Sequence, residues 1–246
     1  MNTRNIAIFG GSFDPFHNGH FALLQKVLAR FHFSQLFLTP TFCSPFKEGS
    51  FFSPNDRLQM CAIVAKELGS KNCEIVACDF EVAQKRVVYS IELVEYVKKL
   101  VESTESYQPK NIEYVQEAKC DLSQRDDTFN GIDLKESKFF FILGLDSFAF
   151  LHRWHKFEKL CKEVEFIVCD RKRQEKISFA TLCARLQIPH LRAHFLEFDS
   201  PLSSTQLRAE LQKSLEFYQL DSVLKQIPSC LYSFVKEILL RKEFVK

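Results

Sequence analysis

Short apolar runs recur along this chain and are separated by longer segments of mixed polarity. Runs of this kind, bounded by glycine, proline or polar residues, predict buried strands. The six runs are IAIF at 6–9, QLFLTP at 35–40, EIVACDF at 74–80, FFFILG at 139–144, FIVC at 166–169 and AHFLEF at 193–198.

Most of the intervening segments carry apolar residues at helical spacing. The segment at 54–68 has signals for both of its ends. Ser53 fits an N-cap, Pro54 and Asp56 fit the first turn, and Gly69 fits the C-terminal end. We expect helices at about 19–31, 54–68, 90–101, 145–162, 179–186 and 203–211, and from about 230 onward. Strands alternating with helices predict an α/β fold, a Rossmann-like doubly wound parallel sheet.

One segment interrupts this alternation. Residues 103–137 are polar, mixed in charge and weakly periodic, which predicts a surface insertion. A chain of 246 residues supports one substantial core and only marginally two. We therefore expect a single domain over residues 1–246, with an insertion at about 103–137.

Composition narrows the class of protein. Hydrophobic residues make up 46% and charged residues 26% of the chain, as is ordinary for a globular protein. The net charge of +2 gives no global field toward nucleic acid or anionic membrane, so we expect neither partner. The N-terminal residues contain no long apolar stretch, and no apolar run approaches about 18 residues. We expect a cytoplasmic protein.

The chain has nine cysteines and no C-x-x-C pair. Several of them sit inside apolar runs, as in FIVC at 166–169. This pattern predicts buried free thiols in a reducing compartment and argues against a zinc knuckle.

Candidate chemistry gathers where strands are expected to end. Glycine- or serine-rich loops follow three predicted strands, at 10–20, 144–147 and 202–205. In open parallel sheets, ligands bind outside the carboxyl ends of the strands. The three loops therefore predict one site at that edge.

The loop GGSFDPFHNGH at 10–20 contains two adjacent glycines and two histidines three residues apart. Glycines after a strand let backbone N–H groups approach phosphate oxygens, and a helix starting near Gly19 adds its positive end. The residues alone leave three readings open: a phosphate cradle, a metal site, or a tight turn with satisfied histidines. His17 and His20 without a third ligand are weak evidence for metal.

The same loop resembles the signature of the H-x-G-H nucleotidyltransferase superfamily, whose members transfer AMP or CMP from a nucleoside triphosphate to a phosphate acceptor. Here the motif is HNGH at 17–20. The form with two glycines, SFDP and a first histidine is most similar to the bacterial nicotinate-nucleotide adenylyltransferase family.

Further motifs of that family follow in order over nearly the whole chain, outside 103–137. The lysine loop is SPFKEG at 44–49, in which Phe46 stands where the family has histidine. A loosely matched loop is VYS at 88–90. The remaining matches are Arg57 and Met60, LGLDS at 143–147, Trp154, Arg171 at the end of FIVCDR, and LSSTQLR at 202–208.

The resemblance implies a nucleotidyltransferase-type fold and adenylyl transfer from ATP to nicotinate mononucleotide, with Mg²⁺ bound mainly through ATP and no protein metal site. The implied catalytic residues are His17, His20, Lys47 and Arg208. The implied ATP contacts are Gly10, Gly11, Ser12, Phe13, Gly19, Gly144, Asp146, Ser203, Ser204 and Thr205. The implied nicotinate mononucleotide contacts are Tyr89, Ser90, Trp154 and Arg171.

Two alternatives stay open at this point. One is phosphopantetheine adenylyltransferase of the same superfamily, which usually has threonine at the place of His17. The other is a nucleotide sensor that keeps the fold without transferring a group. The sequence is compatible with a homo-oligomer and does not fix the oligomeric state.

Overall fold

The computed structural model describes residues 4–43, 49–103, 137–171, 183–184, 188, 191–217 and 220–243. Within them six strands form one sheet in the order β3-β2-β1-β4-β5-β6, and every neighbouring pair is parallel. The strands are β1 (Asn5–Gly11), β2 (Gln35–Pro40), β3 (Glu74–Ala77), β4 (Lys138–Gly144), β5 (Glu165–Arg171) and β6 (Ala193–Phe198). All six predicted strands are present.

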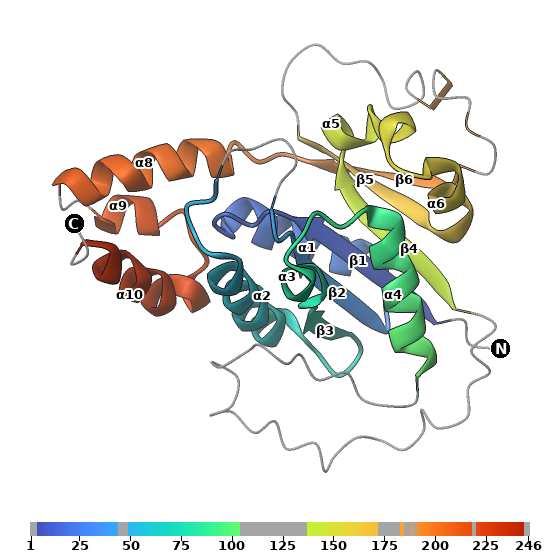
Figure 1. Ribbon diagram of the computed structural model, residues 1–246, viewed down its shortest axis with the longest axis horizontal. Coiled ribbons are helices and arrows are strands. Elements are labelled where there is room, and N and C mark those ends of the chain that lie inside the picture. The colour runs from blue at the N-terminus through green and yellow to red at the C-terminus, as the bar shows by residue number, and fades with distance from the viewer. Residues whose placement is uncertain are drawn as a thin grey trace.

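Helices cover both faces of this sheet, which confirms the doubly wound α/β prediction (Figure 1). Helices α1 and α2 cover one face, and α4, α5 and α6 cover the other. Helices α8, α9 and α10 lie beyond α1 and α2 and add apolar side chains to the same core cluster (Figure 1). The α-helices are α1 (Asn18–Arg30), α2 (Pro54–Leu68), α3 (Phe80–Gln84), α4 (Ser90–Glu102), α5 (Leu145–Phe148), α6 (Phe157–Glu163), α8 (Ser204–Phe217), α9 (Leu220–Leu224) and α10 (Tyr232–Glu243). Two short 3₁₀ turns are η4 (Leu151–Arg153) and η5 (Ser229–Leu231).

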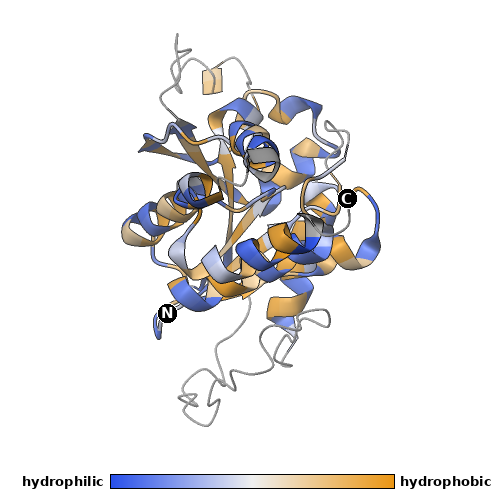
Figure 2. Cartoon of the chain, turned by 90° about the vertical axis from the view of Figure 1, so that its left-hand side faces the viewer, coloured by the Kyte–Doolittle hydropathy of each residue, from blue (hydrophilic) through white to orange (hydrophobic). Residues whose placement is uncertain are grey.

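The alternation of side chains along the strands divides the core into two layers. On β1, Ala7 and Phe9 face α1 and α2, while Ile6 and Ile8 face α4 and α6. In Figure 2 the strands are mainly coloured as hydrophobic, and the helices show both hydrophobic and hydrophilic residues. This is the pattern of a parallel sheet buried on both faces.

Local signals in the sequence explain the helix starts. Ser53 accepts the Asp56 amide N–H at 3.1 Å, and the Asp56 carboxylate accepts the Ser53 amide N–H at 3.0 Å. This capping box, with Pro54 at the first position, begins α2 where the sequence predicts it. Gly69 ends the helix, as predicted.

Three local expectations need correction. The third strand ends at Ala77 instead of Phe80, because the chain turns into the short helix α3. The helical stretch after Gly144 is split into α5, η4 and α6, since Trp154 is extended and Lys156 has a left-handed φ of +51°. The short helices α3 and α9 were not predicted, because five residues carry too little periodicity.

Several other expectations have partial outcomes. The insertion, apart from Ser103 and Ser137, and most of the helix expected at 179–186 lie outside the described residues. The eight described cysteines are free thiols, five of them buried, as predicted. Among the described helices, none is long and apolar enough to cross a membrane. The single-domain assignment stays a prediction.

Candidate active site

The strand order reverses its direction between β1 and β4. From β1 the chain proceeds outward to β2 and β3, and from β4 it proceeds to β5 and β6 on the other side. A crevice forms at the carboxyl edge of such a switch point. Gly10 and Gly11 end β1, and Gly144 ends β4. Two of the three predicted loops therefore flank the same switch point.

The H-x-G-H turn begins helix α1, and both histidines take part in its cap. His17 is the N-cap residue, and its Nδ1 accepts the Gly19 amide N–H at 3.1 Å. The Nδ1 of His20 accepts the His17 amide N–H at 3.3 Å. The two rings stack with centroids 3.8 Å apart. The predicted proximity of the histidines is therefore real, and it arises from a capping box.

These capping bonds restrict what the rings can do. A nitrogen that accepts an amide N–H carries no proton, so in each neutral ring the proton sits on Nε2. With Nδ1 occupied and Nε2 protonated, neither ring has a lone pair for a cation while the cap is intact. The described residues also contain no group of three His, Cys, Asp or Glu side chains placed to hold a metal. The capping bonds therefore place the ring proton on Nε2, a donor of the kind that suits phosphate oxygens. Both rings are buried in this structure, with His17 1% and His20 9% exposed.

Three phenylalanine rings pack around the ring of His20. Phe13 meets it edge-on with centroids 5.2 Å apart, and Phe16 packs against it at 5.2 Å. Phe9 lies 6.4 Å away. Phe13 has a left-handed φ of +43° and is 1% exposed. Its ring thus supports His20, and direct contact of Phe13 with ATP stays a prediction.

Gly19 is required by a close approach. A Cβ at this position would lie 2.8 Å from Ser200 Oγ and 2.9 Å from the His17 ring. Ser200 follows β6 and is itself buried. The absent side chain lets the segment after β6 pack directly against the histidine turn.

Helix α8 brings the third predicted loop to the same place. The segment Ser203, Ser204 and Thr205 forms its start, and the Leu207 amide donates to Ser203 O at 2.9 Å. Arg208 lies one turn further and donates from Nη1 to the Asp14 carbonyl at 2.8 Å. Its Nη2 donates to Thr205 Oγ1 at 3.2 Å. The structure thus joins the LSSTQLR segment to the opening loop across 194 residues of sequence.

Gly144 and Asp146 lie on the β4 side of the crevice. Gly144 is the N-cap of α5, and Asp146 is an exposed residue of its first turn, whose Oδ1 accepts the Ser147 amide N–H at 2.9 Å. Ser12 precedes the histidine turn, and its carbonyl accepts a hydrogen bond from Arg57. Whether these residues contact ATP stays a prediction.

Two segments predicted to bind the acceptor, the start of α4 and the turn around Trp154, also contact each other. Tyr89 caps α4 and is 49% exposed, and its ring stacks on His155 with centroids 4.3 Å apart. Ser90 is the first residue of α4. The neighbouring Trp154 is half-buried and packs edge-on against Phe141, so only part of its ring is available for a ligand.

Two predicted residues cannot be placed in this detail. Lys47 and its neighbour Phe46 lie outside the described residues. Arg171 is the last residue of β5, at the carboxyl edge, and its side chain is likewise not described. Their roles stay predictions.

Sequence reasoning matched Arg57 to a family position without giving it a role, and it passed over Asp14. Arg57 is almost fully buried and donates to backbone carbonyls of the loops around the site. The sequence did contain a signal for the burial of Arg57. This residue starts a helical stripe that continues with Met60, Cys61 and Val64, all of them buried. A charged residue on an apolar stripe indicates a specific set of partners.

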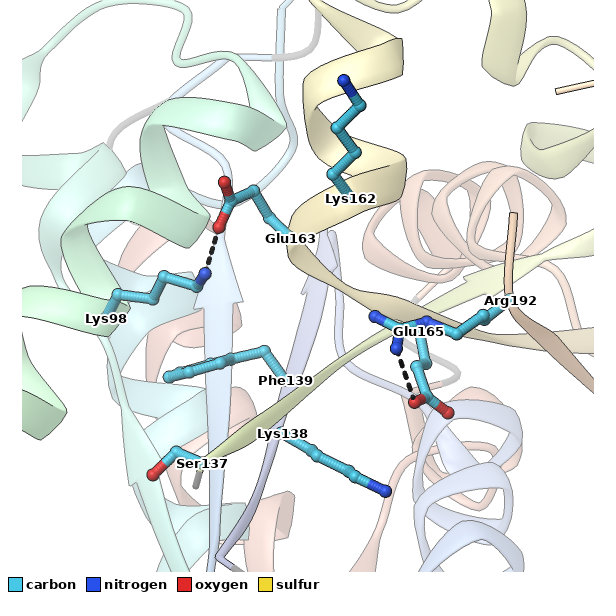
Figure 3. Close-up of a pocket in the computed structure, with 8 residues that line it drawn as sticks. All are labelled: Lys98, Ser137, Lys138, Phe139, Lys162, Glu163, Glu165 and Arg192. Atoms are coloured by element: carbon cyan, nitrogen blue, oxygen red, sulfur yellow. Dashed lines mark hydrogen bonds and ion pairs between the residues drawn. The ribbon is translucent and has the colours of Figure 1, made fainter. Parts of the chain in front are cut away.

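A pocket of about 230 Å³ lies at the opposite edge of the sheet, where β4 and β5 begin (Figure 3). Figure 3 shows Lys98 facing Glu163 on one side and Arg192 facing Glu165 on the other. Lys98 also lies 5.1 Å from the centroid of the Phe139 ring. Since the histidine turn is at the carboxyl edge, this pocket is separate from the candidate active site.

Comparison with known proteins agrees with this geometry. The cytidylyltransferase-like family profile matches residues 8–210. A Helicobacter hepaticus protein named probable nicotinate-nucleotide adenylyltransferase is 32% identical, and the match covers 94% of each chain. A protein of the same name from Campylobacter jejuni is 35% identical over 68% of this chain and 71% of its own.

A solved structure shares the fold. It is the Plasmodium falciparum nicotinic acid mononucleotide adenylyltransferase complexed with NaAD, with a TM-score of 0.65 and 20% identity over 99% of this chain and 100% of that one. The resemblance seen in the motifs is thus confirmed over nearly the full length. This chain belongs to the cytidylyltransferase-like family and, within it, to the nicotinate-nucleotide adenylyltransferases.

Proposed function

We propose that this protein transfers the adenylyl group of ATP to the phosphate of nicotinate mononucleotide. The products are nicotinate adenine dinucleotide and pyrophosphate. The observation that carries the proposal is the pair of stacked histidines, whose Nδ1 atoms cap α1 at the carboxyl edge beside the β1–β4 switch point. The names of the relatives from Helicobacter hepaticus and Campylobacter jejuni support this choice of acceptor.

The reaction needs no general base. A phosphate monoester has a second pKa of about 6, so its oxygens are already nucleophilic near neutral pH. One oxygen of the mononucleotide phosphate forms a bond to the α-phosphorus of ATP, and the bond from that phosphorus to the β-phosphate bridging oxygen breaks. The protein must align the two substrates and stabilise the charge that develops.

His17 and His20 are suited to that second task. Their Nε2–H groups would donate to oxygens of the transferring phosphoryl group, without a proton being transferred. Because the cap fixes both rings, little reorganisation accompanies the reaction. Arg208 and Lys47 would hold the β- and γ-phosphates, and the serines and threonine at 203–205 would add donors at the start of α8.

Mg²⁺ is proposed to arrive with ATP. It would offset the charge of the triphosphate, and triphosphate oxygens and water would supply most of its ligands.

The acceptor would lie between the start of α4 and the turn after η4. Trp154 would offer part of its ring to the pyridine, Tyr89 and Ser90 would close the other side, and Arg171 would meet the mononucleotide phosphate. We further propose that the enzyme works in the cytoplasm.

Pyrophosphate release tests this function against its rivals. The purified protein is given ATP with nicotinate mononucleotide, nicotinamide mononucleotide or 4′-phosphopantetheine. We expect the fastest release with nicotinate mononucleotide. Fastest release with phosphopantetheine would assign the other enzyme, and silence with all three acceptors would favour a nucleotide sensor.

A further inference from the structure

The side chain of Asp14, in the opening loop, forms hydrogen bonds to the segment that leads into α2. Its Oδ2 accepts the Phe51 amide N–H at 3.0 Å, and its Oδ1 accepts the Phe52 amide N–H at 2.8 Å. Asp14 is only 4% exposed. Both carboxylate oxygens thus hold consecutive amides of a segment 37 and 38 residues away.

Arg57 binds the same segment as a donor, whereas Asp14 binds it as an acceptor. Its Nε donates to the Phe52 carbonyl at 3.3 Å, and its Nη1 donates to the Ser12 carbonyl at 2.8 Å. The same Nη1 donates to the Thr41 carbonyl at 2.6 Å, and Nη2 donates to the Phe42 carbonyl at 2.9 Å. One side chain therefore joins the loop after β1, the loop after β2 and the entry to α2.

Burying the charges of Arg57 and Asp14 costs desolvation free energy, so packing alone does not explain these two residues. Arg57 is 1% exposed, and burial lowers its pKa, with the charge of Asp14 acting in the opposite direction. A well-packed apolar side chain often serves stability as well as a buried charge does. What an apolar side chain cannot do is fix four carbonyls from separate loops in one geometry.

The segment so held runs from the end of β2 at Pro40 to the start of α2 at Pro54. Arg57 holds its first residues, Thr41 and Phe42, and Asp14 with Arg57 holds Phe51 and Phe52 near its other end. Both ends are therefore tied to the loop that carries the histidines.

We propose that Asp14 and Arg57 are a pair of positioning residues that hold the loop carrying the histidine turn against residues 41–42 and 51–52. This inference rests on the proposed function, since the placement matters only if the histidine turn meets the phosphates of ATP. Their contribution reaches the reaction through the loops they join. For Asp14 it also acts through Arg208, whose Nη1 lies 3.8 Å from Asp14 Oδ2.

The test uses Arg57→Lys and Asp14→Asn in the full chain. A lysine ammonium keeps the charge but cannot reach four carbonyls, and an asparagine amide replaces one of the two accepting oxygens. We expect kcat/KM for ATP, per folded molecule, to fall by about 10²-fold in each, since small misplacements of reacting groups cost this much. KM for nicotinate mononucleotide should change far less.

Two control variants separate positioning from lost stability. Met60→Ala removes a fully buried side chain from the same helix, and Asp56→Asn removes the carboxylate that accepts the Ser53 amide within the α2 cap. Both should lower the melting temperature and leave kcat/KM per folded molecule within a few-fold of the wild-type value. If the controls lose as much ATP turnover as Arg57→Lys at matched melting temperature, the positioning role is wrong.

The double variant gives a second readout. Because both residues hold Phe52, the combined loss in kcat/KM should be smaller than the product of the single losses. Independent, multiplicative losses would contradict a shared clamp. An inactive wild-type enzyme would instead overturn the proposed function, so the two failures are distinguishable.

Discussion

At the scale of single residues, the two histidines of the turn are fixed by the same bonds that start α1. Each Nδ1 accepts a backbone amide, which leaves the proton of each neutral ring on Nε2, and both rings are buried. The spacing of three residues in the sequence predicted that the rings would be close. The spacing did not distinguish a metal site from a phosphate site, because the tautomer of each ring depends on the hydrogen bonds of the folded turn.

Replacing His20 by alanine tests the donor role directly. We expect His20→Ala to lower kcat by at least about 10²-fold, the usual cost of losing one transition-state donor. His32→Ala changes an exposed histidine beyond the C-terminal end of α1 and serves as the matched control. Steady-state kinetics with thermal melts checks both, and near-wild-type turnover in His20→Ala would remove His20 from the mechanism.

Glu81 is a buried carboxyl group of α3 that the proposed mechanism does not use. Burial raises its pKa from 4.5 to about 8, opposed by the charge of Arg57 and reinforced by that of Glu92. Between these values the folded protein keeps a proton that the unfolded chain releases. Stability should therefore fall as pH rises through this window, by about 1.4 kcal/mol per pH unit at most.

The variant Glu81→Gln removes this titration and keeps the shape of the side chain. We expect its unfolding free energy, relative to wild type, to rise steadily from pH 5 to pH 8. Urea unfolding at several pH values measures the difference. Parallel curves for the two proteins would show that Glu81 does not titrate as described.

At the scale of elements, predictions succeeded where a local signal was sufficient. The Ser53–Asp56 capping box and Gly69 define both ends of α2, and the stripe from Ile91 to Val101 is buried on α4, as expected. Predictions failed where backbone geometry decides. Nothing in the periodicity after Gly144 indicates the left-handed Lys156 that separates η4 from α6.

The start of α1 offers an element-scale test in which two effects oppose each other. Alanine is favoured over glycine within a helix by about 1 kcal/mol. At Gly19, however, the added Cβ would press on Ser200 Oγ and on the His17 ring, which the cap holds in place.

We expect the clash to prevail in Gly19→Ala. The variant should melt at a lower temperature and lose turnover, because the cap that orients both histidines must shift. Differential scanning calorimetry and initial rates measure the two effects. A variant that is more stable and fully active would show that the turn accommodates a side chain.

At the scale of the whole molecule, the topology explains why distant motifs form one site. Parallel strands place all their carboxyl ends at one edge, so the glycine loop, LGLDS and LSSTQLR were predicted to meet. The bond from Arg208 to the Asp14 carbonyl confirms the meeting of two of them. What topology could not reveal is the clamp of Asp14 and Arg57, since its partners are backbone atoms without a sequence signature.

The central claim is adenylyl transfer to nicotinate mononucleotide, and direct detection of the dinucleotide product tests it. The wild-type protein is incubated with ATP, Mg²⁺ and either nicotinate or nicotinamide mononucleotide, and the products are separated by chromatography. We predict that nicotinate adenine dinucleotide and pyrophosphate form in equal amounts, and that kcat/KM is higher for the nicotinate acceptor. Absence of the dinucleotide, or a clear preference for nicotinamide mononucleotide, would contradict the proposed function.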